Sequence, residues 1–184
     1  MVKSLCFTQE VMIILDSSFK NSVDKDIIRS RHQVWSNPWH FLGFGFGSGL
    51  SKYAPGTFGT LAAIPFYLLL VQLPWLWYGL LTLLALLIGI HICQVTSDDL
   101  GVHDFSGIVW DEFVGLWITM FLIPFEWQWL LLGFIFFRFF DIIKPWPINY
   151  LDKYAKGGFG IMIDDVLAGI YAWFCLFMVV KYYS

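Results

Sequence analysis

Apolar residues concentrate in five segments that follow one another from residue 58 towards the C-terminus. Several of these segments are shorter than the roughly 20 residues that cross a bilayer as a helix. Flanking residues must then supply the missing length, or the bilayer must thin around the protein. The pattern predicts an all-α fold, a small polytopic membrane helix bundle with about five short spans. The expected spans are 61–73, 76–95, 113–123, 129–140 and 161–180.

A glycine-rich interfacial stretch precedes these spans. Residues 43–60 contain six glycines, and glycine costs about 1 kcal/mol relative to alanine in a helix. Glycine also lets backbone N–H groups approach a ligand, and a helix starting near Thr57 would point its positive end at an anion. The stretch therefore predicts a phosphate-binding segment, to which Lys52, Thr57 and Thr60 add a charge and hydroxyls. A close-packed glycine seam between membrane helices is the alternative.

The composition fits lipid as the main solvent of this chain. Of its 184 residues, 58% are hydrophobic and 14% are charged, whereas a soluble domain carries about 25% charged residues. The net charge of −3 gives no basic footprint for nucleic acid, so we expect no such partner. Residues 1–34 mix acids and bases, and their apolar run is too short for a signal peptide. We expect a soluble extension over 1–34 and a membrane-embedded domain over 35–184.

Basic residues are distributed unevenly between the two faces that the spans define. Lys181 falls on the face opposite the N-terminal tail, and the remaining basic residues of the bundle fall on the tail side. Basic residues favour the cytoplasmic side of a membrane, so we expect the tail side to be cytoplasmic. The basic residues on that side are Lys52, Arg138, Lys144, Lys153 and Lys156.

Acidic residues gather on the same face as these cations. Consecutive acids open the third span and lie near the start of the fifth, and helix dipoles alone explain one acid per helix start more easily than two. Carboxylates at the membrane edge are costly and usually functional. Mg²⁺ takes carboxylate oxygens and bridges to substrate phosphate. We therefore predict a metal site formed by Asp111, Glu112, Asp141, Asp164 and Asp165.

Further polar residues near these acids are candidates for phosphate binding and proton transfer. Arg138, Asp141 and Lys144 follow one another at intervals of three near the end of the fourth span, although snorkelling at the membrane edge would also explain them. Histidine titrates near neutral pH, so His103 is a candidate proton donor, with an ordinary loop histidine as the alternative. The candidates for catalysis are Asp99, His103, Asp141 and Lys144. The candidates for phosphate binding are Lys52, Thr57, Thr60, Arg138, Lys144, Gly157 and Gly158.

Four blocks of the sequence resemble signature blocks of the phosphatidylglycerophosphatase A family. They read GFGSGLSKYAPGTFGTLAAIP, DLGVHDFSGIVWDEFVGLWIT, FRFFDIIKPWPI and GGFGIMIDDVLAGI, and they occur in that order. The resemblance extends from about residue 37 to residue 173 and leaves the N-terminal tail outside. Its charged positions include Asp99, Asp111, Glu112, Asp141, Lys144, Asp164 and Asp165.

The resemblance implies a helical, Mg²⁺-dependent lipid phosphatase of the bacterial inner membrane. Its substrate would be phosphatidylglycerophosphate among the membrane phospholipids, and its products would be phosphatidylglycerol and phosphate. Two other classes remain open at this stage. One is another Mg²⁺-dependent membrane phosphotransferase, although a DGxxAR-like pattern is absent from the sequence. The other is a cation transporter, which would need acids at several depths rather than at one level.

Overall fold

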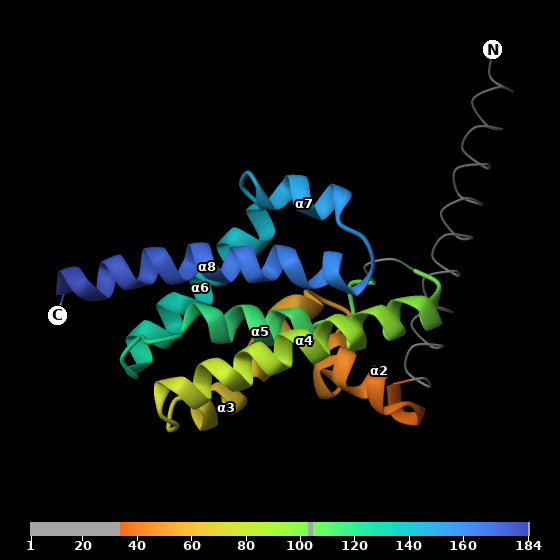
Figure 1. Ribbon diagram of the computed structural model, residues 1–184, viewed down its shortest axis with the longest axis horizontal. Helices are drawn as coiled ribbons and strands as arrows, with labels where there is room; N and C mark the ends of the chain where they lie inside the picture. Colours follow the sequence, from red (N-terminus) through yellow and green to blue (C-terminus); the bar gives the residue numbers. More distant parts are fainter. Residues whose placement is uncertain (1–33, 103–104, 184) are drawn as a thin grey trace, which may run out of the picture.

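The computed structural model describes residues 34–102 and 105–183, and within these ranges the chain forms helices and loops without a strand. The fold is therefore all-α, as predicted. A short helix α2 and a 3-10 segment η1 precede the main helices (Figure 1). The elements are α2 (Pro38–Gly43), η1 (Gly45–Leu50), α3 (Pro55–Leu70), α4 (Trp75–Leu100), α5 (Trp110–Thr119), α6 (Trp127–Ile143), α7 (Ile148–Tyr154) and α8 (Gly157–Tyr183).

Each of the five expected spans corresponds to one helix: α3, α4, α5, α6 or α8. The helices α4 and α8 are long and apolar enough to cross a membrane, and α3 is a shorter apolar helix. The ten residues of α5 rise only about 15 Å, roughly half the thickness of a bilayer's hydrocarbon core. Short helices within the bundle are thus confirmed, and two of the five reach the length of a complete span by themselves.

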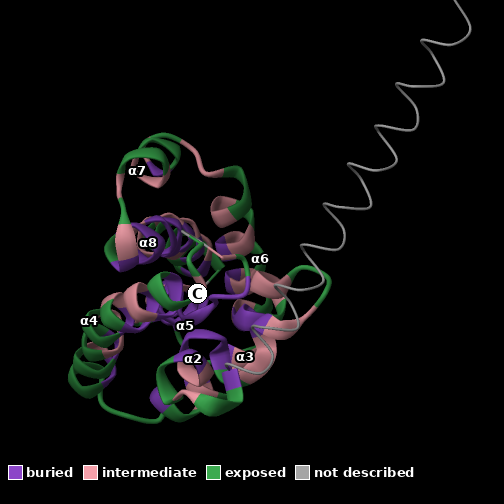
Figure 2. Cartoon of the chain, turned by 90° about the vertical axis from the view of Figure 1, so that its right-hand side faces the viewer, coloured by how far each residue is buried: buried purple, intermediate pink, exposed green. Residues whose placement is uncertain are grey.

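The short helix α5 lies at the centre of the bundle. It packs against α3, α4, α6 and α8, and every residue of α5 except Asp111 and Ile118 is buried (Figure 2). Glycines allow its closest contact, because a Cβ on Gly169 of α8 would lie 2.6 Å from the carbonyl oxygen of Gly115. The Thr119 hydroxyl donates to that carbonyl at 2.9 Å and lies 3.3 Å from the carbonyl of Gly169. Small residues and a hydroxyl are typical of contacts between membrane helices.

The outer face of α4 is covered by leucine. Leu76, Leu80, Leu84 and Leu87 are all exposed on it. Continuous apolar surface of this kind is unusual on a soluble monomer. It is expected where hydrocarbon chains surround the protein.

The chain reverses direction between successive long helices, so that one end of the bundle collects the polar helix ends (Figure 1). The C-terminal end of α4 and the N-terminal ends of α5 and α8 lie towards this end, on the right of the view, and α6 ends further back, near the middle of the bundle. The acids of α5, α6 and α8 come close together towards this end. We refer to this end of the molecule as the polar end.

The contact between Gly169 and Gly115 can be tested by adding a single methyl group. We expect Gly169→Ala to destabilise the fold by about 1–3 kcal/mol, because one backbone must shift to admit the new Cβ. Gly79→Ala on α4 is the matched control, since its Cβ would meet only the ring of Phe121 at 3.4 Å. Thermal unfolding in detergent micelles should show a lower Tm for the first variant alone, and equal Tm values would contradict the close packing of α5 on α8.

Candidate active site

Glu112 lies in the first turn of α5 and is only 7% exposed. Its Oε2 atom accepts a hydrogen bond of 2.9 Å from the hydroxyl of Thr60 on α3. The same oxygen forms an ion pair with the guanidinium of Arg138 on α6. A buried carboxylate requires such partners, because an unpaired charge out of water costs several kcal/mol. Glu112 thereby ties three helices together at the polar end.

Arg138 connects two carboxylates. Besides the pair with Glu112, its Nη1 atom lies 2.8 Å from Oδ2 of Asp141, three residues further along α6. Glycine at position 56 permits this arrangement, because a Cβ there would collide with Oε1 of Glu112 and lie 3.0 Å from both terminal nitrogens of Arg138. The predicted i, i+3 pairing of Arg138 with Asp141 is therefore present. The first turn of α3 lies directly against it.

Asp164 and Asp165 lie two turns inside α8 rather than near its start. The helix begins at Gly157, so Asp164 stands about 10 Å further along it, and its first turn holds no acid. Gly157 and Gly158, which we predicted to bind phosphate before this span, form the first turn of the helix. Gly158 N–H donates to Oε1 of Gln94 at 2.7 Å, and a Cβ at Gly158 would collide with the carbonyl of Ile90. Because Gly157 and Gly158 pack closely on α4, α8 begins at Gly157 and not at residue 161, where the predicted span starts.

Asp165 has the least compensated carboxylate of the cluster. It is 3% exposed, and its Oδ2 atom has no hydrogen-bond partner among the residues that the structure describes. It lies within electrostatic range of the other four acids of the predicted metal set, Asp141, Glu112, Asp111 and Asp164. Arg138 lies within electrostatic range of Asp165, but neither a helix dipole nor a described hydrogen bond to Oδ2 offsets this charge. A ligand of opposite charge would explain it.

Lys144 ends α6 in the left-handed conformation, with φ of 45°, and leaves the helix face that carries Arg138 and Asp141. Its ammonium group donates to Oδ2 of Asp164 and to Oδ1 of Asp152 on α7, each at 2.6 Å. Burial lowers the pKa of Lys144, but these hydrogen bonds outweigh burial and raise the pKa above its ordinary value. Lys144 is thus a fixed cation at physiological pH.

The donor chemistry of this cluster suits Mg²⁺, which prefers oxygen ligands. In the structure, however, three of these carboxylates form ion pairs with basic side chains. Glu112 and Asp141 pair with Arg138, and Asp164 pairs with Lys144. In residues 34–102 and 105–183, no three histidine, cysteine, aspartate or glutamate side chains are grouped closely enough to hold one ion. Binding an ion with several of these acids therefore requires some of them to turn away from Arg138 or Lys144.

Asp99, one of the predicted proton donors, lies outside this group of contacts. Oδ2 of Asp99, whose side chain is 48% exposed, lies 2.8 Å from Nε2 of His40, which is buried between α2 and α4. His103 lies outside the described residues. The pairing of His40 with Asp99 was not predicted from the sequence. The fifty-nine residues that separate the two leave no local pattern to reveal the contact.

Other predicted phosphate-binding residues are only partly brought together. Thr60 and the backbone of Gly56 lie at the Glu112–Arg138 pair, Thr57 is half-buried one residue beyond Gly56, and Lys52 is exposed on the loop before α3. Gly158 uses its N–H group to contact Gln94. Asp152 was not predicted to be a site residue. Its position eight residues after Lys144, on the same polar face, could have indicated that it pairs with Lys144.

The fold and the site define a class: a helical membrane protein with a charged, partly buried site at one end of its bundle. Residues 41–180 match the family model described as phosphatidylglycerophosphatase A. The chain therefore belongs to the phosphatidylglycerophosphatase A family, whose members are phosphatases and thus hydrolases.

Several curated relatives support this assignment. The chain is 53% identical to phosphatidylglycerophosphatase A of Escherichia coli over 79% of its own length and 85% of the relative's. It is 52% identical to the Haemophilus influenzae protein of the same name, over 78% and 89% of the two chains. A Bacteroides thetaiotaomicron protein, named as a candidate phosphatidylinositol-3-phosphatase, is 41% identical over 71% and 86%. No solved structure matches the chain.

The pairing of Arg138 with two carboxylates predicts a large effect on stability. Arg138→Met leaves Glu112 and Asp141 without their cation, so we expect a loss of about 3–5 kcal/mol. Thermal unfolding in detergent micelles measures this loss of stability. Lys153→Met is the control, because Lys153 is exposed. Adding Glu112→Gln to Arg138→Met should recover part of the loss, because the buried negative charge is then removed. A wild-type Tm for Arg138→Met would show that the ion pairs contribute little.

Proposed function

We propose that this protein hydrolyses the phosphate monoester of phosphatidylglycerophosphate to give phosphatidylglycerol and phosphate during phospholipid synthesis. The observation that carries the proposal is the carboxylate cluster around Arg138 and Lys144. Over more than three quarters of its length, the chain is also 53% and 52% identical to two proteins named phosphatidylglycerophosphatase A. A phosphate ester at the end of a lipid would reach such a site from headgroup depth. The grouping of acids at one end of the bundle also favours headgroup chemistry over a cation path across the membrane.

The cations of the site suit the binding of phosphate oxygens. Lys144 keeps its charge, and the buried Nε atom of Arg138 has no hydrogen-bond partner among the described residues, which leaves a donor for a ligand. Charge-assisted hydrogen bonds to phosphate are the strong kind and stabilise charge that develops in the reaction. The first turn of α3 adds backbone N–H groups, since its N-cap residue, Ala54, offers no side-chain cap.

We include Mg²⁺ in the proposal. Asp165 would be its first ligand, joined by some of Asp111, Glu112, Asp141 and Asp164. When bound, the ion would neutralise phosphate charge and polarise a water molecule. Thr60 does not bind phosphate in this scheme. Its hydroxyl lies between the carbonyl of Gly56 and Glu112, so it holds that carboxylate in place.

The leaving glycerol oxygen needs a proton. Asp99 and His103 are the residues proposed to supply it, and Oδ2 of Asp99 lies 2.8 Å from Nε2 of His40. The unequal distribution of basic residues supports a reaction on the cytoplasmic side of a bacterial inner membrane.

Asp165→Asn tests the role of the uncompensated carboxylate. We expect phosphate release from phosphatidylglycerophosphate to fall at least about a hundredfold, while the Tm stays equal or rises because one repelling charge is gone. Asp98→Asn is the control, since Asp98 is exposed and its side chain bonds only to Gln94 among the described contacts. Full activity of Asp165→Asn would remove this residue from the site.

Metal dependence is tested with the purified wild-type protein. We expect EDTA to abolish phosphate release, and added Mg²⁺ to restore it, because the carboxylates outnumber the cations that could otherwise bind a phosphate dianion. Full activity in EDTA would contradict the Mg²⁺ part of the proposal alone. Phosphatidylinositol 3-phosphate, assayed beside phosphatidylglycerophosphate, separates the activities that the relatives' names describe.

A further inference from the structure

An apolar groove with a volume of about 510 Å³ runs between α3 and α4. Both helices pack on α5, whose Trp110 and Trp117 form part of the floor of the groove. The walls include Phe66 and Leu69 of α3 and Leu84 of α4. Leu84 is 51% exposed, and Leu69 is exposed as well, so the groove opens sideways to the surroundings of the bundle.

The lining of this groove can bind only hydrocarbon. Every lining residue is leucine, isoleucine, alanine, phenylalanine or tryptophan. The indole N–H groups of the two tryptophans are already used, since Trp110 donates to the carbonyl of Ala85 at 3.1 Å and Trp117 donates to that of Ala63 at 3.2 Å. A polar ligand would lose its hydration here without gaining a hydrogen bond.

One end of the groove lies beside the candidate active site. Trp110 directly precedes Asp111 and Glu112, and Phe66 lies six residues along α3 from Thr60, a helix rise of about 9 Å. Leu42 of α2 closes this end, and the view from the polar end shows α2 between α3 and α4 (Figure 2). A molecule that enters the site at headgroup depth therefore meets the groove a short distance away.

The length of the groove matches one leaflet. Along α4 its lining extends from Ile92 back to Leu81, a rise of about 17 Å at 1.5 Å per residue. Half of a hydrocarbon core of about 30 Å is about 15 Å. A single acyl chain of a lipid whose headgroup lies at the polar end would extend over this depth.

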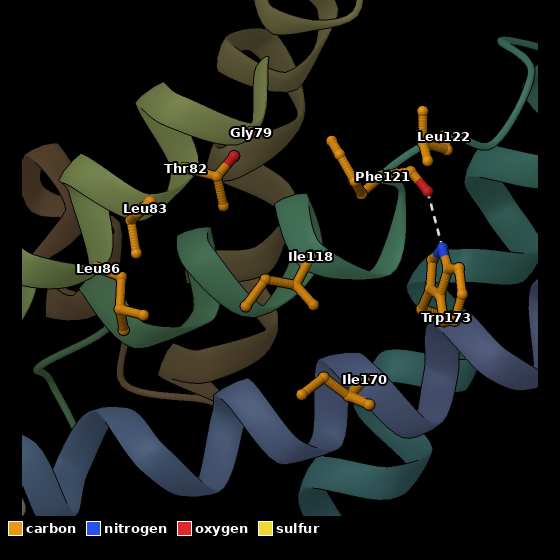
Figure 3. A pocket seen from close by; sticks show the side chains of 9 residues that line it. All are labelled: Gly79, Thr82, Leu83, Leu86, Ile118, Phe121, Leu122, Ile170 and Trp173. Atoms are coloured by element: carbon orange, nitrogen blue, oxygen red, sulfur yellow. Dashed lines mark hydrogen bonds between the residues drawn. The ribbon is translucent and has the colours of Figure 1, made fainter. Parts of the chain in front are cut away.

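A second apolar groove lies on the other side of α4, against α5 and α8 (Figure 3). Its lining begins at Leu86 and continues to Gly79, Leu122 and Trp173, towards the opposite end of the bundle. It therefore begins deeper than the site and leads away from it. Its position provides a comparison for the groove between α3 and α4.

We propose that the groove between α3 and α4 binds one acyl chain of the lipid substrate and thereby positions the phosphate at Arg138 and Lys144. The inference rests on the proposed function, because it assigns the chain to the lipid that is hydrolysed. It also implies that a phosphate ester with very short chains binds weakly, since it cannot fill the groove.

Leu84→Trp tests the proposal by filling the groove. Its matched control is Leu87→Trp, on the same helix at a residue that is 58% exposed and lines neither groove. Phosphate release is measured in mixed micelles with Mg²⁺, from phosphatidylglycerophosphate carrying either two oleoyl or two butyryl chains. We expect Leu84→Trp to raise the KM for the oleoyl substrate at least about tenfold and to leave kcat/KM for the butyryl substrate unchanged. Leu87→Trp should match the wild type with both substrates.

The outcomes separate the two proposals. The groove proposal is refuted if the wild type is active and Leu84→Trp has the same kinetics as Leu87→Trp. It is also refuted if KM rises only in Leu83→Trp, a substitution that fills the second groove. If Leu84→Trp loses both activities, the milder Ile88→Phe in the same groove must show the selective rise in KM, and its absence refutes the groove. A wild type that hydrolyses neither substrate refutes the proposed function instead.

Discussion

The polar end of this bundle depends on the neutralisation of buried carboxylates by Arg138. Glu112 and Asp141 both face its guanidinium, and Thr60 supplies the remaining hydrogen bond to Glu112. Without that cation, α5 and α6 would bring two negative charges together out of water, and the cost would exceed what nearby packing returns. The glycine at position 56 is a consequence of the same requirement, because any side chain there would occupy the space of the ion pair. Stability thus depends on the same arginine that the proposed function assigns to phosphate binding.

The shortness of α5 explains how charged groups come to lie inside a membrane bundle. A complete span would carry both of its ends to water, whereas ten residues rise only about 15 Å. The helix therefore begins below the level at which the longer α4 and α8 emerge, and its first turn faces the second turn of α8. Asp165, two turns inside α8, is buried at this level, although aspartate side chains are usually exposed. The acidic cluster therefore depends on the difference in length between α5 and the longer α4 and α8, as well as on the positions of the acids in the sequence.

Hydropathy predicted the helices because each long apolar run here forms one helix, and the i, i+3 spacing predicted the pair of Arg138 with Asp141. Helix starts were harder to predict. The predicted span began at residue 161, yet Gly157 and Gly158 pack on Gln94 as the first turn of the helix, so Asp164 lies two turns inside it. Contacts made across long separations, such as His40 with Asp99, left no periodic signal. The left-handed end of α6, which directs Lys144 to Asp152, likewise depends on tertiary contacts.

The two faces of α5 also constrain how a lipid could bind. Trp110 and Trp117 are seven residues apart and share one side of the helix, which forms the floor of the acyl groove, whereas Glu112 points to α3 and α6. A substrate with its chain in the groove and its phosphate at Arg138 must therefore pass over the first turn of α5. Its position along the groove then sets the depth of its phosphate, since the glycerol backbone between them has a limited reach. Chain binding and phosphate placement are coupled in this geometry, so binding energy from the hydrocarbon could be used to orient the reacting ester.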